Sequence, residues 1–252
     1  MKIISHTSNE DKEWSSICIR SQREFAEKHG ITYTLYENLS LSGRSAKWAR
    51  FRAMMGEIIA APIGEAIVWM DSDLLIMNPE FDLIGMAREF EQNSDLAGCF
   101  FTMGTKLDMS LALVKNVRGA RELFEYGWDI GKLEGQGDRR DRFSVDLMCM
   151  LAPEFFTTVI ADRILSQWYP ISPKNLFDHK IDSQDGKVGV FTMKKPREIV
   201  EGFPDIYMPG SFAVHLNCKG PYLLKLSEDF LHYRERMMKS VLEARQLTKD
   251  LV

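Results

Sequence analysis

The sequence has few cysteines, no long apolar run and no excess of charge of one sign. Four cysteines are spread over 252 residues without a Cys-x-x-Cys pair, so we expect reduced thiols rather than a zinc site or a disulfide framework. No stretch approaches the roughly 18 apolar residues of a membrane-spanning helix. The net charge of -4 offers no basic surface for nucleic acid, which argues against that partner.

A signal peptide is also missing from the sequence as it stands. The opening residues, Met-Lys-Ile-Ile-Ser-His-Thr, become polar too early for an apolar export segment. We therefore expect a cytoplasmic chain without a membrane span. A hydrophobic content of 45% over 252 residues is enough to bury the core of one large domain or two small ones.

Strand and helix patterns alternate along the chain, which predicts the α/β class. In the first third the order is strand, helix, strand, helix, strand, and this order favours parallel strands joined by right-handed crossovers. The expected strands are 2–7, 31–36, 67–70, 96–101, 111–114, 169–171, 188–193 and 211–216, and the expected helices are 9–29, 45–59, 82–91, 117–128 and 227–251. We expect a surface loop at 131–142 and the last helix packed across the sheet.

The stretch 65–79 carries the clearest chemical signal. Residues 67–70 form a short apolar, β-branched and aromatic run that predicts a buried strand, and Asp71 and Asp73 follow it directly. A carboxylate beside a dry core costs several kcal/mol unless it is paired. A divalent cation is the obvious partner, at the strand ends where open α/β sheets hold their ligands.

Three segments together resemble a known family. They are Trp-Ala-Arg-Phe at 48–51, Trp-Met-Asp-Ser-Asp-Leu-Leu-Ile-Met-Asn-Pro at 69–79 and Gly-Ser-Phe-Ala-Val-His-Leu-Asn-Cys at 210–218. The chain is similar to GT-A-fold, metal-dependent glycosyltransferases of the retaining galactosyl-, xylosyl- and mannosyl-transferase and glycogenin-like families. The resemblance implies one GT-A domain over 1–252, with a mixed central sheet flanked by helices. It divides into a nucleotide-sugar half at 1–110, an acceptor half at 111–225 and a C-terminal amphipathic helix at 226–252.

The resemblance also implies a donor and metal site. Asp71, Asp73 and His215 match the residues that hold Mn²⁺ or Mg²⁺ on the diphosphate of a nucleotide sugar, and an oxygen-rich site with one imidazole suits Mn²⁺ somewhat better. Asp146 is the nearest match to a residue contacting the transferred sugar, although Leu147 stands where the family pattern has glutamine. The residues implied at the nucleotide and phosphates are Ser5, His6, Thr7, Lys47, Arg50, Asp71, Ser72 and Lys219.

Other interpretations of the same residues stay open. The two aspartates also fit a pair that caps a turn, His215 fits a satisfied core histidine, and Arg50 fits the solvated face of a helix. The main functional hypothesis is transfer of a sugar from a nucleotide-diphosphate donor, presumed UDP-linked, to a saccharide acceptor. The alternatives are a haloacid-dehalogenase-like phosphatase and a non-catalytic nucleotide-sugar-binding module. The sequence predicts no oligomeric state.

Overall fold

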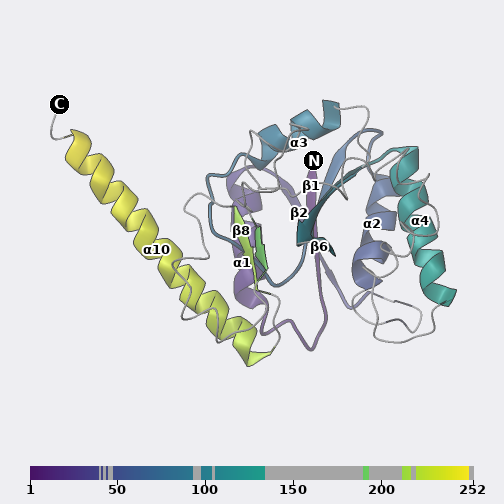
Figure 1. The fold of residues 1–252 in the computed structure, drawn as a ribbon, viewed down its shortest axis with the longest axis horizontal. Coiled ribbons are helices and arrows are strands. Elements are labelled where there is room, and N and C mark those ends of the chain that lie inside the picture. Colours follow the sequence, from purple (N-terminus) through teal and green to yellow (C-terminus); the bar gives the residue numbers. More distant parts are fainter. Residues whose placement is uncertain are drawn as a thin grey trace.

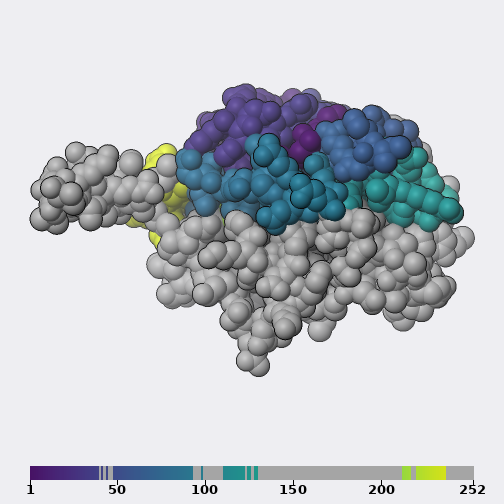
Figure 2. All heavy atoms as spheres, turned by 90° about the horizontal axis from the view of Figure 1, so that it is seen from above, coloured from purple at the N-terminus to yellow at the C-terminus, as the bar shows by residue number. Residues whose placement is uncertain are grey.

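The computed structural model describes nearly two thirds of the chain. Figure 2 shows the coloured residues of the first half of the chain, from purple through blue to teal, lying side by side on the face that is seen. The described residues fall in several separate ranges. They are 1–39, 41, 44, 48–92, 98–103, 106–133, 190–192, 212–216 and 220–249.

A five-stranded mixed sheet forms the centre of the fold, which confirms the predicted class (Figure 1). Its strand order is β2-β1-β3-β6-β5. β1 pairs in parallel with both β2 and β3, whereas β6 runs antiparallel to β3 and to β5. The strands are β1 (Lys2–Thr7), β2 (Thr32–Glu37), β3 (Ala66–Met70), β5 (Gly98–Met103) and β6 (Lys106–Lys115).

Helices cover both faces of this sheet because alternate residues of its central strands are apolar on each side. On one face α1 and α3 pack on Ile3, Val68 and Met70. On the other, α2 and α4 lie side by side over Ile4 and Trp69, with the ring of Phe51 against that of Phe124 (Figure 1). The helices are α1 (Ser16–Lys28), α2 (Ala49–Ala60), α3 (Leu83–Gln92) and α4 (Arg118–Leu133).

A second, three-stranded sheet has the order β4-β8-β7. Its strands are β4 (Leu74–Ile76), β7 (Val190–Thr192) and β8 (Ala213–His215). β8 pairs antiparallel with β4 and parallel with β7. The chain passes from the central sheet to this one across only three residues, 71–73, so the two predicted metal-binding aspartates stand at the junction of the two sheets.

The last helix, α10 (Pro221–Lys249), starts beside α1 and β8 and then runs away from the body of the molecule (Figure 1). Leu223, Leu226 and Phe230 near its start pack into a buried cluster with Cys18 and Val214. We expected this helix to pack across the sheet; in the structure its first turns pack on the second sheet and on α1.

Several predicted boundaries were wrong for local physical reasons. The first helix was expected to begin at Asn9, but the side chain of Asn9 accepts a hydrogen bond from the Asn38 amide, and the helix begins at Ser16. Its predicted end is confirmed, since Gly30 takes a φ of 65°, the left-handed conformation that glycine adopts without strain. The predicted loop at 131–142 also started too early, because α4 continues to Leu133.

The last helix begins earlier than predicted, at Pro221 rather than near residue 227. Proline is favoured at the first helical position because it has no N–H to leave unpaired there. None of the described helices is long and apolar enough to cross a membrane. The expected cytoplasmic location and the division into halves stay predictions.

Candidate metal centre

The turn between β3 and β4 positions both aspartates. The Leu74 amide donates to the Asp71 carbonyl at 3.0 Å, which closes a four-residue turn with Ser72 and Asp73 at its centre. The Asp71 amide donates to the Ser110 carbonyl of β6 at 2.8 Å. The turn is therefore anchored to the central sheet on one side and continues into the second sheet on the other.

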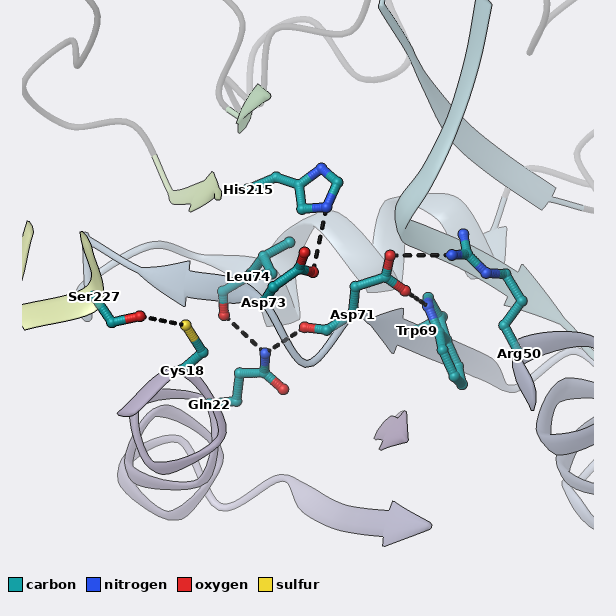
Figure 3. Close-up of polar contacts among 9 residues, drawn as sticks. All are labelled: Cys18, Gln22, Arg50, Trp69, Asp71, Asp73, Leu74, His215 and Ser227. Carbon is teal, nitrogen blue, oxygen red and sulfur yellow. Dashed lines mark hydrogen bonds and ion pairs between the residues drawn. The ribbon is translucent and has the colours of Figure 1, made fainter. Parts of the chain in front are cut away.

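His215 reaches the same turn from a segment about 140 residues later in the chain. It ends β8, where it is the register partner of Leu74, and the Leu216 amide donates to the Asp73 carbonyl at 3.1 Å. The His215 Nε2 atom lies 3.3 Å from an Asp73 carboxylate oxygen (Figure 3). One ligand atom each from Asp71, Asp73 and His215 lies within 4.8 Å of the others.

Both carboxylate oxygens of Asp71 accept hydrogen bonds. The Trp69 indole Nε1 donates at 2.6 Å to one oxygen, and Arg50 at the start of α2 donates at 3.1 Å to the other (Figure 3). The pKa of Asp71 is raised to about 6: burial is the main cause and nearby Asp73 adds to it, while Arg50, His215 and the Trp69 hydrogen bond act in the opposite direction. The site thus holds more negative charge than one arginine neutralises, which favours a further cation.

The chemistry of these three side chains fits a divalent metal ion. A carboxylate oxygen has two lone pairs, so the bonds from Trp69 and Arg50 leave each Asp71 oxygen able to bind a cation. Two carboxylates and one imidazole are ligands that Mn²⁺ accepts and Mg²⁺ tolerates. Asp71, Asp73 and His215 would hold the ion.

The segment predicted to receive the nucleoside ends β1, beside the carboxyl end of β3. Ile4 is the register partner of Trp69, so Ser5, His6 and Thr7 continue past it at the same edge of the sheet as Asp71. All three are buried. The Thr7 hydroxyl shares a hydrogen bond of 3.2 Å with Ser15. Their contact with a nucleotide stays a prediction.

Four other predicted site residues have different outcomes. Ser72 lies half-buried at the centre of the turn, and its role stays a prediction. Lys47, Asp146 and Lys219 fall outside the described residues. The structure therefore brings together the three predicted metal ligands and Arg50.

Two residues at the site were missed from the sequence, Trp69 and Gln22. Trp69 stands two residues before Asp71, and this spacing places both side chains on the same face of a strand. Gln22 lies on the buried face of α1, among Ile19, Phe25 and Ala26. A polar residue at a core position of an amphipathic helix is the signal that would have indicated a specific hydrogen-bonding role.

Comparison with protein families gives an independent indication of function. A model of the galactosyl transferase GMA12/MNN10 family matches residues 2–89, which include β1, Arg50 and both aspartates. The first third of the chain is similar to a glycosyltransferase family. An uncharacterised alpha-1,2-galactosyltransferase of Schizosaccharomyces pombe (strain 972 / ATCC 24843) is 28% identical over 82 residues, which span 31% of this chain and 22% of that protein.

Comparison with solved structures shows which fold the chain shares. A glycosyltransferase involved in the glycosylation of the major capsid of PBCV-1 aligns with a TM-score of 0.55 and 12% identity, over 92% of this chain and 98% of that one. Mouse xyloside xylosyltransferase 1 aligns more weakly, with a TM-score of 0.47 and 9% identity over 86% and 97% of the two chains. The family match and the fold match do not favour the phosphatase hypothesis.

Proposed function

We propose that this protein is a divalent-metal-dependent glycosyltransferase with a UDP-linked sugar as donor and a saccharide as acceptor. The observation that carries the proposal is the meeting of Asp71, Asp73 and His215 within 4.8 Å at the junction of the two sheets. Two of these residues lie inside the segment that matches the glycosyltransferase family. Asp71, Asp73 and His215 would hold a cation there, which would supply Lewis-acid neutralisation of the charge on the diphosphate leaving group of a nucleotide sugar.

We propose galactose as the first sugar to test. The matched family is described as galactosyl transferases, and the Schizosaccharomyces pombe relative carries that activity in its name. The family model matches residues 2–89, which lie inside the segment 1–110 that we propose to bind the nucleotide sugar. The alignment does not extend to an acceptor pocket, so the acceptor is defined only as a saccharide.

The reaction exchanges one bond at the anomeric carbon for another. The bond from that carbon to the diphosphate oxygen breaks, and a bond to an acceptor hydroxyl oxygen forms. The hydroxyl proton passes to the departing diphosphate, which makes a protein nucleophile unnecessary and gives retention when both events occur on one face. Arg50 keeps Asp71 ionised and oriented for the donor complex.

The remaining residues have assigned positions in this proposal. Asp146 contacts the transferred sugar. The residues proposed to bind the nucleoside and the phosphates are Ser5, His6, Thr7, Ser72, Lys47 and Lys219.

UDP release from purified protein tests the proposal. The chain would be incubated with UDP-galactose, UDP-glucose, UDP-xylose or GDP-mannose, with saccharide acceptors, in Mn²⁺ or in a chelator. We expect release from a UDP-sugar that requires both metal and acceptor. Asp73→Asn should abolish it, whereas Asp82→Asn should not, because Asp82 caps α3 through the Gly85 amide at 2.8 Å and asparagine caps equally well.

Two outcomes would contradict the proposal. Binding of UDP with Mn²⁺ but no release with any donor and acceptor would favour the non-catalytic module. Hydrolysis of a generic aryl phosphate, with no response to nucleotide sugars, would restore the phosphatase hypothesis.

A further inference from the structure

A buried glutamine of α1 holds the backbone of the turn that carries the two aspartates. The Gln22 side-chain nitrogen donates at 2.8 Å to the Asp71 carbonyl and at 2.8 Å to the Leu74 carbonyl (Figure 3). Both N–H groups of the amide are therefore used, one on each end of the turn. Gln22 is fully buried. If its side chain were removed, the two carbonyls would lose their partner where water has no access, which is costly in free energy.

The orientation of the Gln22 amide is fixed by a second residue. The Tyr33 hydroxyl of β2 donates to the Gln22 side-chain oxygen at 3.2 Å. Burial raises the pKa of Tyr33 to about 12, so its hydroxyl stays protonated and able to donate. An amide whose oxygen accepts from Tyr33 must direct its nitrogen toward the two carbonyls.

The clamped turn sets the relative positions of the three candidate ligands. Asp71 and Asp73 lie in the turn, and Leu74 at its end is the register partner of His215. Metal coordination tolerates shifts of only about 0.2 Å in ligand distance. A relaxed turn would move both carboxylates relative to the imidazole.

Neighbouring Ser21 provides an internal reference for this role. Ser21 is also buried, and its hydroxyl accepts from the Ile76 amide at 3.1 Å, further along the same edge of β4. Ser21 and Gln22 thus both protect the edge of β4 that does not face β8. Of these two side chains, that of Gln22 bonds to the aspartate-bearing turn, and that of Ser21 bonds to Ile76 beyond it.

We propose that Gln22, oriented by Tyr33, is a positioning residue of the metal centre that acts through the main chain of the Asp71–Leu74 turn. This inference rests on the proposed function, because it assumes that Asp71, Asp73 and His215 hold a divalent ion. Gln22 touches no ligand oxygen of the side chains. It controls where those oxygens lie.

The test measures Mn²⁺ affinity by electron paramagnetic resonance of the free ion, with UDP present, alongside the unfolding temperature. Gln22→Met keeps the length of the side chain and removes both donors, and Ser21→Ala is the matched control. We expect both variants to unfold at lower temperature. Gln22→Met should also weaken Mn²⁺ binding about tenfold or more, as loss of groups that orient ligands does elsewhere, whereas Ser21→Ala should bind as the wild type does.

Tyr33→Phe is the second variant, which keeps the test decisive if Gln22→Met does not fold. It leaves Gln22 in place but frees its amide to rotate, so it should weaken Mn²⁺ binding by a smaller factor. Equal Mn²⁺ affinity in wild type and in the folded Gln22 or Tyr33 variants would overturn the positioning role alone. A wild type that binds no Mn²⁺ even with UDP would overturn the metal centre and the positioning role together.

Discussion

Charged side chains are arranged differently at the two ends of β3. Near its amino end, the Met1 ammonium lies 2.8 Å from Glu65, and Lys2 lies 2.7 Å from the buried Glu57. At its carboxyl end, Asp71 and Asp73 share a small volume with His215, and Arg50 pairs with Asp71. Paired charges stabilise the first end, whereas the second concentrates carboxylates at some cost in stability, a pattern typical of functional sites.

The largest expected effect comes from Asp73→Asn at the carboxyl end. Transfer from the donor sugar should fall at least about a hundredfold, because the cation that stabilises the leaving diphosphate is worth several kcal/mol. The unfolding temperature without metal should not fall, since the change removes a negative charge beside Asp71. Transfer assays and thermal unfolding measure the two effects. If Asp73→Asn lowered the unfolding temperature but left the transfer activity of the folded protein unchanged, Asp73 would be a structural residue and not a metal ligand.

Lys2→Met at the amino end should lower the stability of the protein and leave its metal binding unchanged. Glu57 is 7% exposed and would lose its cation, while Lys2 itself is one-third exposed. Because water partly screens such a pair, we expect a loss of about 1–3 kcal/mol in the free energy of unfolding. Denaturant titration measures this loss, and Mn²⁺ affinity should not change. A weakened metal affinity would show that the two ends are not independent.

The prediction from sequence was most successful where the signal was local. The run Ile67–Met70 is buried on both faces and predicted β3 to within one residue. Asp71 and Asp73 were found because charges directly after such a run are unusual. The match of His215 to the aspartates came from the family resemblance, since no local pattern links positions so far apart.

What the sequence did not predict depends on contacts between distant segments. β4 has only three residues, and its partner β8 lies about 140 residues later, so we predicted no strand at this position. The predicted helix start at Asn9 was wrong because the pairing of Asn9 with Asn38 is not visible in the sequence. The bonds of Gln22 and Trp69 to the Asp71 region depend likewise on how α1 and β3 pack against the turn.

The smallest expected effect concerns His6, near the carboxyl end of β3. Burial lowers its pKa, and nearby Asp11 opposes this effect. As the pH falls, His6 is therefore protonated in the unfolded chain first, near pH 6.5, and in the folded protein only at a lower pH. The stability that neutral His6 contributes is present above that pH and is lost as the pH falls through the lower folded value. An NMR titration should give a midpoint for His6 below about 6.5, and a midpoint above it would contradict the burial argument.

Thermal unfolding with UDP and Mn²⁺ tests the contrast between the two ends of β3 most directly. The wild type, Lys2→Met and Asp73→Asn would each be measured with UDP alone and with UDP and Mn²⁺ at about 100 times the wild-type dissociation constant. We predict a metal-dependent stabilisation of roughly 2.7 kcal/mol in the wild type and in Lys2→Met. Asp73→Asn should show none. Equal stabilisation of all three proteins, or of none, would contradict a metal and nucleotide site at the carboxyl end of β3.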